Sequence, residues 1–161
     1  RNSVASGVRT SPVSVIGIGI MGTAIVTRLR GRGHPVTLFG RTAAKLAPLE
    51  ALGAARAASP AAAASASRFV ITCVNTSAIM REIVFGPDGI AQAPPDNRLL
   101  IDMSSIDPEA TRQMAAELAT TTDMRWVDAP LSGGAEVLAE VCVGVSVALA
   151  SGTGYCARSL S

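Results

Sequence analysis

The chain has 161 residues, of which 48% are hydrophobic and 16% are charged, and this composition excludes an intrinsically disordered protein. The formal net charge of +2 is too small to indicate a nucleic-acid-binding protein. The length predicts about one globular domain, and no apolar segment is long enough to span a membrane.

Three cysteines lie far apart, at Cys73, Cys142 and Cys156, and they lack the spacing of metal ligands. We therefore expect reduced thiols and no metal site. Residues 1–11 are polar and small, so we expect a disordered lead and no signal peptide. These features predict a cytoplasmic location.

A strand, a glycine-rich turn and a helix follow this lead. The β-branched run Val13–Ile18 predicts the strand, and the apolar segment Met21–Arg30 predicts the helix. Between them lie three glycines with the spacing of a dinucleotide-binding turn: Gly17, Gly19 and Gly22. In such a turn the first glycine permits the tight bend, the second lets a pyrophosphate approach the backbone, and the third lets the helix pack on the strand. The phosphates then bind at the helix N-terminus, although a purely structural turn is the alternative.

The second predicted strand, Val36–Phe39, ends at an arginine where NAD-binding chains usually carry a carboxylate. No Asp or Glu lies between Gly31 and Pro48, and Arg41 is followed by the donor Thr42. A guanidinium suits a phosphate, which predicts a site for the 2′-phosphate of NADP rather than for NAD. The alternative is a solvated arginine that opens a helix.

The remaining elements alternate between helix and strand. We expect a helix over Thr42–Leu52 with a kink or split at Pro48, a short strand around Ala55, a helix opened by Ser59 and Pro60, and a buried strand over Phe69–Val74. A helix over Ser77–Val84, a strand over Leu99–Met103, a helix opened by Asp107 and Pro108, and a strand over Arg125–Asp128 follow. This alternation predicts an α/β fold with a doubly wound parallel sheet of the Rossmann type.

Several small residues follow strand ends at the same edge as the glycine turn: Ser104, Ser105, Ser132, Gly133 and Gly134. Their hydroxyl and N–H groups are able to bind a small anion, and ordinary loop and cap residues are the alternative. The only histidine, His34, is expected in a turn rather than as a catalytic base, because no neighbour would orient it.

With these motifs the chain resembles the β-hydroxyacid dehydrogenase family, which includes 3-hydroxyisobutyrate dehydrogenase and tartronate semialdehyde reductase and is related to 6-phosphogluconate dehydrogenase. The matching segments are 17–22, 33–37, 41–42, 102–105 with 108–109, and 128–134. The last segment is the most specific, since imine reductases share only the first half of the pattern. The resemblance covers about residues 13–136, which predicts a Rossmann domain over residues 12–136 and a divergent tail over residues 137–161.

The resemblance implies NADP as the cofactor and a small β-hydroxyacid as the substrate. The cofactor-binding residues that it implies are Gly17, Gly19, Ile20, Met21, Gly22, Arg41, Thr42, Val74, Asn75 and Ser105. The substrate-binding residues that it implies are Ser132, Gly133 and Gly134. Asn75 is a departure, because the family has a Leu-Pro pair where this chain has Val74 and Asn75.

The tail also departs from the family, since Val137, Leu138 and Val141 replace small residues, although residues 141–149 are able to form one further strand. A changed reading frame near Glu136 would explain this divergence. Family members continue into an all-helical domain that supplies a catalytic lysine, the dimer interface and part of the substrate pocket. The only lysine here, Lys45, is expected at the solvated surface on the adenosine side, so no catalytic residue is assigned and the oligomeric state is left open.

Two functions remain open on this evidence. One is an NADP-dependent dehydrogenase of small β-hydroxyacids, inactive as this chain alone, in which hydride passes between the substrate carbon and the nicotinamide. The other is a non-catalytic dinucleotide-binding module or a truncated gene product.

Overall fold

The computed structural model describes residues 10–130, and the expectations for residues 1–9 and 131–161 lie outside this range. The strands are β1 (Val13–Ile16), β2 (Val36–Phe39), β3 (Ala55–Arg56), β4 (Phe69–Thr72), β5 (Leu99–Asp102) and β6 (Arg125–Asp128). The helices are α1 (Ile20–Gly31), α2 (Ala43–Ala51), α3 (Pro60–Ser65), α4 (Ser77–Phe85), the short 3₁₀ helix η1 (Ile90–Gln92) and α5 (Pro108–Thr121). No helix within residues 10–130 is long and apolar enough to cross a membrane.

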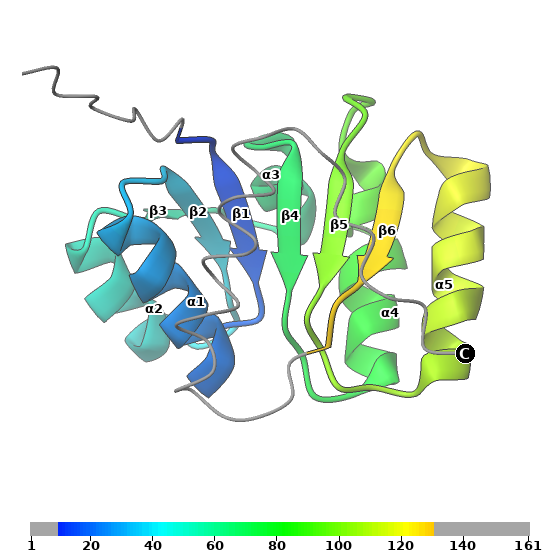
Figure 1. Ribbon diagram of the computed structural model, residues 1–161, viewed down its shortest axis with the longest axis horizontal. Helices are drawn as coiled ribbons and strands as arrows, with labels where there is room; N and C mark the ends of the chain where they lie inside the picture. The colour runs from blue at the N-terminus through cyan, green and yellow to red at the C-terminus, as the bar shows by residue number, and fades with distance from the viewer. Residues whose placement is uncertain (1–9, 131–161) are drawn as a thin grey trace, which may run out of the picture.

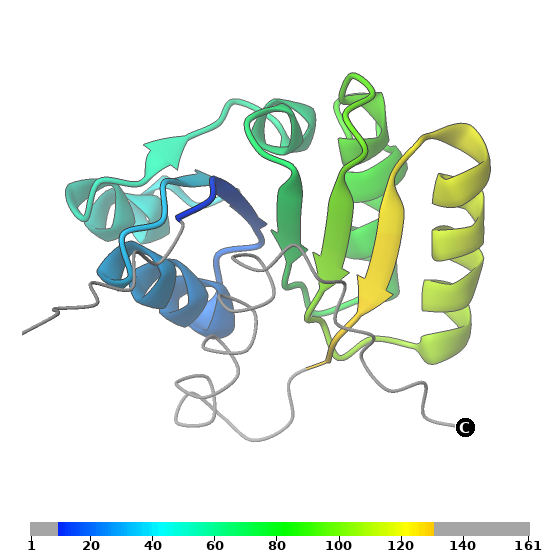
Figure 2. The same cartoon turned by 45° about the horizontal axis from the view of Figure 1, so that its top comes forward.

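The six strands form one parallel sheet in the order β3-β2-β1-β4-β5-β6, which confirms the predicted doubly wound Rossmann fold. Helices α1 and α2 lie on one side of the sheet, and α4 and α5 lie on the other (Figures 1 and 2). The chain leaves β1 toward β2 on one side and later returns to β4 on the other side. The carboxyl ends of β1 and β4 therefore flank the switch point, where ligands of such sheets bind.

Two apolar clusters, one on each face of the sheet, form the core. Val13 and Val15 of β1 pack with α1 and α2, whereas Ile16 packs in the second cluster with α3, α4 and α5. Because both faces are covered, the central strands are predominantly apolar on both faces, with single buried polar residues such as Ser14. Burying each aliphatic side chain of this kind stabilises the folded chain by about 1.5–3 kcal/mol.

Two helix starts follow the predicted capping chemistry, and a third does not. The Ser59 hydroxyl accepts a hydrogen bond from the Ala62 N–H (3.0 Å), and the Asp107 carboxylate accepts one from the Ala110 N–H (2.8 Å). Thr42 occupies the N-cap position of α2, but its side chain makes no capping hydrogen bond. The Thr42 hydroxyl therefore stays available at the end of β2.

The predicted split of α2 at Pro48 and the predicted ends of two strands were wrong. Helix α2 runs without a break through Pro48, because the carbonyl that loses its hydrogen bond belongs to the exposed Ala44 while Leu46 and Leu49 anchor the helix in the core. Strands β1 and β4 each end two residues earlier than expected. The apolar runs continue through Ile18 and Val74, but the backbone has already left the sheet to form the ligand-side loops.

Two polar side chains at the amino edge of the sheet are buried and hydrogen-bond to backbone carbonyls. His34 is fully buried, with Nδ1 3.0 Å from the Ser11 carbonyl oxygen. Arg98, 4% exposed, donates from Nε to the carbonyls of Ala64 (2.7 Å) and Ser67 (3.2 Å). His34 thus lies at the edge opposite the glycine turn, in the connection between α1 and β2.

Candidate functional site

The turn between β1 and α1 excludes side chains at two of its three glycines. Gly17 has φ of +97°, and a Cβ there would lie 2.1 Å from the Cys73 carbonyl oxygen. A Cβ on Gly22 would lie 2.0 Å from the Gly17 carbonyl oxygen. These two glycines therefore let β1, α1 and the loop after β4 approach one another.

Gly19 has a different role, because a Cβ at this position would meet no atom within 4 Å. The backbone at Gly19 is exposed, and it opens α1 as the N-cap residue. The first N–H groups of the helix have no intrahelical acceptor, and no acidic residue in the first turn competes for them. Ile20, the first helical residue, is 84% exposed, so this end of α1 is open to an anionic ligand.

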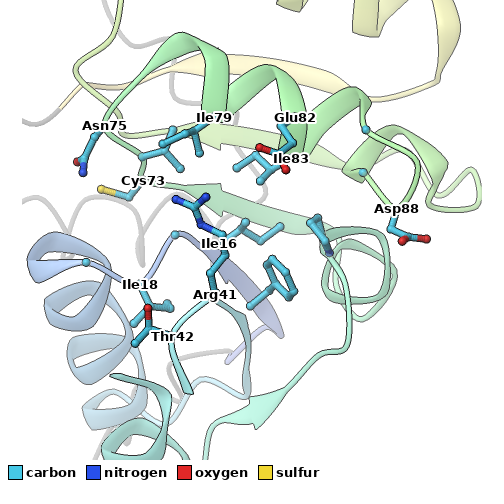
Figure 3. Close-up of a pocket in the computed structure, with 18 of the residues that line it drawn as sticks. Ile16, Ile18, Arg41, Thr42, Cys73, Asn75, Ile79, Glu82, Ile83 and Asp88 are labelled. Carbon is cyan, nitrogen blue, oxygen red and sulfur yellow. The ribbon is translucent and has the colours of Figure 1, made fainter. Parts of the chain in front are cut away.

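A cavity of about 360 Å³ opens beside this turn, between the carboxyl ends of β1, β2 and β4 and the helix α4 (Figure 3). Six of the predicted cofactor residues line it, together with the predicted surface residue Lys45: Gly17, Gly19, Arg41, Thr42, Val74 and Asn75. Ile20, Met21 and Gly22 belong to the first turn of α1 beside it. Ser105 follows β5, is exposed, and does not line this cavity.

Arg41 extends from the end of β2 into the cavity (Figure 3). Its side chain is exposed and forms no hydrogen bond or ion pair with any residue of the described part of the chain. Thr42 beside it has an uncommitted hydroxyl, as described above. A free guanidinium next to a free hydroxyl is a donor set that suits a phosphate.

Asp102, at the end of β5, connects the loops that follow β4 and β5. It is fully buried, and Oδ1 accepts hydrogen bonds from the Ser104 N–H (2.9 Å) and the Thr72 hydroxyl (3.2 Å). The Ser104 hydroxyl in turn accepts from the Val74 N–H (2.9 Å). For Ser104 this favours the alternative of an ordinary loop residue over anion binding, because Ser104 is 3% exposed and its hydroxyl accepts from the protein backbone.

Burial raises the pKa values of two groups near these loops. The pKa of Asp102 is raised by burial, although hydrogen bonds from Ser104 and Thr72 oppose the shift. The pKa of the Cys73 thiol is raised by burial and by the negative charge of Asp102. Cys73 lines the cavity, and its raised pKa keeps the thiol protonated rather than nucleophilic at neutral pH.

Sequence reasoning missed the wall of the cavity that α4 supplies, above all Ile79, Glu82 and Ile83. The only local signal was the apolar pair Ile79 and Ile83, one helical turn apart in a helix that follows a central strand. Within residues 10–130, no group of three His, Cys, Asp or Glu side chains is able to hold a metal ion. The predicted substrate residues Ser132, Gly133 and Gly134 lie outside the described residues.

Comparison with known proteins decides the family. The model of the NAD-binding domain of 6-phosphogluconate dehydrogenase matches residues 12–148. The chain belongs to this family. As an NAD-binding domain it has the glycine turn, the exposed N-terminus of α1 and the cavity in the places where the fold puts a dinucleotide.

Two curated relatives show how much of a longer protein this NAD-binding domain represents. The chain is 31% identical over 140 residues to the cytokine-like nuclear factor N-PAC of Xenopus tropicalis, which is 87% of this chain and 26% of that protein. It is 37% identical over 119 residues to the mitochondrial 3-hydroxyisobutyrate dehydrogenase-like protein 2 of Arabidopsis thaliana, which is 74% of this chain and 40% of that protein. The chain thus spans about a quarter to two-fifths of the length of these relatives.

Solved structures of oxidoreductases also resemble this NAD-binding domain. The NAD-binding domain superposes on 3-hydroxyisobutyrate dehydrogenase of Mycobacterium tuberculosis, solved with L-serine, with a TM-score of 0.74 and 30% identity, covering 82% of this chain and 44% of that one. It superposes on a reductive aminase from Aspergillus terreus, solved with NADPH, with a TM-score of 0.68 and 27% identity, covering 80% of this chain and 44% of that one.

Proposed function

We propose that this chain is the NADP-binding domain of an oxidoreductase that acts on the CH–OH group of small β-hydroxyacids such as 3-hydroxyisobutyrate. The observation that carries the NADP assignment is the Arg41 guanidinium in the cavity at the end of β2, which has no partner within residues 10–130. The NADPH bound to the reductive aminase and the dehydrogenase name of another relative support the cofactor and the reaction class. We also propose a cytoplasmic location, because the spacing of the three cysteines indicates reduced thiols.

The residues of the chain fit this cofactor at three points. The free N–H groups at the start of α1 hold the pyrophosphate, with Gly19 admitting it to the backbone. Arg41 and Thr42 hold the 2′-phosphate, and Ser105 contacts the ribose on the nicotinamide side. The cofactor supplies hydride transfer when it is bound, while the protein binds and orients it.

Cofactor preference tests the proposal directly. We expect NADPH to bind at least about tenfold more tightly than NADH, because a hydrogen bond to a charged group is worth about 1.5–3 kcal/mol and Arg41 is solvent-exposed. Arg41→Ala should remove most of that difference, as measured by isothermal titration calorimetry with both cofactors. Arg56→Ala, which removes an exposed arginine outside the cavity, is the matched control.

Two results would contradict this assignment in different ways. Equal affinities for NADPH and NADH in the unmodified chain would overturn the NADP preference while leaving dinucleotide binding intact. Binding of neither cofactor would overturn the proposed function itself.

As a chain on its own, we expect cofactor binding without turnover. A positioned acid or base contributes about 10²–10⁴-fold to such a reaction. The only lysine, Lys45, lies at the Arg41 side of the cavity, and His34 is buried at the opposite edge of the sheet. Nicotinamide absorbance, followed with NADP and a panel of small β-hydroxyacids, should show no useful rate.

A non-catalytic dinucleotide-binding module is the second candidate. The position of Lys45 favours it, and so does the likeness to N-PAC, whose name is that of a nuclear factor rather than of an enzyme. Turnover of about 1–10³ per second by the chain alone would exclude this candidate.

A further inference from the structure

Part of the cavity lining is apolar, and we call the part formed by Ile79, Ile83 and Phe39 the apolar slot. Ile79 and Ile83 lie one turn apart on α4 and are half-buried, so they present one continuous aliphatic surface. Phe39, at the end of β2, adds aromatic surface to the lining. Apolar walls of this kind fit a flat heteroaromatic ring, whose polar atoms then need partners at the rim of the slot.

Glu82 supplies one acidic group at that rim. Figure 3 shows Glu82 and Arg41 reaching into the cavity from opposite walls, Glu82 from α4 and Arg41 from the end of β2. The Glu82 carboxylate is exposed and has no hydrogen-bond or ion-pair partner within residues 10–130. An ionised carboxylate only accepts hydrogen bonds, so it fits a ligand group that donates.

The positions of the Arg41 and Glu82 charges favour one orientation of a dinucleotide in the cavity. The 2′-phosphate belongs beside Arg41, where the guanidinium attracts it, and away from Glu82, which would repel it. The base then lies in the apolar slot along Ile79 and Ile83. In that position its polar edge faces the carboxylate rather than the guanidinium.

We propose that Glu82 accepts a hydrogen bond from the exocyclic amine of the cofactor's purine, so that the site selects an aminopurine dinucleotide over its oxo analogue. The proposal rests on the proposed function, since it concerns the same cofactor in the same cavity. It adds a residue that chooses the base, whereas Arg41 chooses the phosphate.

Calorimetric titration of the full chain with NADPH and with its hypoxanthine analogue tests this directly. The analogue carries a carbonyl oxygen in place of the 6-amino group, so an acceptor replaces the donor at this position. We expect NADPH to bind roughly three- to tenfold more tightly than the analogue, because the carboxylate is solvent-exposed. Glu82→Met, which keeps the length but not the acceptor, should bring the ratio of the two dissociation constants close to one.

Three further variants sharpen the measurement. Glu82→Gln keeps a neutral acceptor and should retain a reduced preference, whereas Glu50→Met, on the exposed surface of α2 outside the cavity, should retain the full preference. Asp88 also lines the cavity, so Asp88→Asn tests the other nearby carboxylate. The ratio is insensitive to any general change in affinity that comes from removing a negative charge.

Some outcomes would overturn the assignment. Equal binding of NADPH and the analogue by the unmodified chain, or a preference that survives Glu82→Met or disappears in Asp88→Asn, would reject Glu82 as the group that selects the base. Those results leave the preference for NADPH over NADH untouched, so the proposed function would stand. Binding of neither cofactor would remove both proposals together.

Discussion

The two edges of the sheet place an arginine side chain in opposite environments. At the amino edge, Arg98 is 4% exposed and donates to carbonyls at the end of α3 and in the following loop. At the carboxyl edge, Arg41 is exposed and has no partner within the described residues, although it projects into a cavity. The protein pairs one guanidinium with its own carbonyls and leaves the other one exposed to solvent.

The two arginines differ because Arg98 is buried in the protein, whereas Arg41 is exposed to solvent. A buried polar group has to be paired, because leaving it without a partner costs about 1–3 kcal/mol or more. The Ser14 hydroxyl, fully buried in β1, follows this rule by lying 2.8 Å from the Ser67 hydroxyl. Arg41 and Thr42 at the carboxyl edge escape the cost because they are exposed to solvent.

The largest effect that we predict concerns the amino edge. Arg98→Met should lower the free energy of unfolding by about 3–5 kcal/mol, because it strips buried carbonyls of a charged donor. Urea denaturation measures this change, and Arg68→Met, at an exposed position on the same edge, should cost little. Cofactor affinity, measured where the variant is folded, should stay the same. A selective loss of affinity would break the division between the two edges.

The glycine turn contains both kinds of position within three residues. Gly17→Ala should cost about 2–4 kcal/mol of stability, because the new Cβ would meet the Cys73 carbonyl at a positive φ. Gly19→Ala should leave stability nearly unchanged, since open space surrounds that position, but it should weaken NADPH binding. Thermal unfolding and calorimetry separate the two effects. Equal stability losses in both variants would show that Gly19 also serves the fold.

The two neighbouring serines after β5 provide a smaller test. Ser104→Ala should lower the free energy of unfolding by about 1–2 kcal/mol, because the Val74 N–H loses its acceptor. Ser105→Ala removes an exposed hydroxyl and should affect cofactor affinity rather than stability. Chemical denaturation and cofactor titration of both variants check the prediction. A stability loss confined to Ser105→Ala would reverse the two roles.

Local patterns were enough to predict the sheet and one end of the site. The glycine spacing and the missing carboxylate before Pro48 are features of consecutive residues, and the alternation of strands and helices predicted the doubly wound sheet. Strand ends were harder, because Ile18 and Val74 extend the apolar runs after the backbone has left the sheet. Periodicity reports side-chain polarity, whereas the end of a strand depends on the loops that meet there.

The rest of the site depends on tertiary packing that no local pattern encodes. Ser104 and Ser105 are identical neighbours, and only the buried position of Asp102 commits the first to the protein. Glu82 became a candidate for cofactor binding because α4 forms one wall of the cavity. The roles of Ser132 to Gly134 and of the tail stay predictions, as they lie outside the described residues.

Asp102 falls between the two classes, because it is buried like the amino-edge groups but lies at the carboxyl edge. Oδ1 is bonded, whereas Oδ2 has no hydrogen-bond partner within residues 10–130. Burial raises its folded-state pKa above the unfolded value of about 3.9, so the folded chain holds the proton more tightly. The free energy of unfolding should therefore fall as the pH rises from about 4 through the folded pKa.

The smallest effect that we predict is the loss of this pH dependence in Asp102→Asn. The amide oxygen is able to replace Oδ1 as the acceptor for Ser104 and Thr72, while the NH₂ group replaces the unpartnered Oδ2. Because the amide does not titrate, the variant should lose less stability than the unmodified chain between about pH 4 and pH 7. Burial also raises the pKa of Asp128, so part of the slope should remain. Urea denaturation across this range measures the slope, with Asp88→Asn as the exposed control. An unchanged slope in Asp102→Asn would mean that Asp102 titrates alike in the folded and unfolded chains.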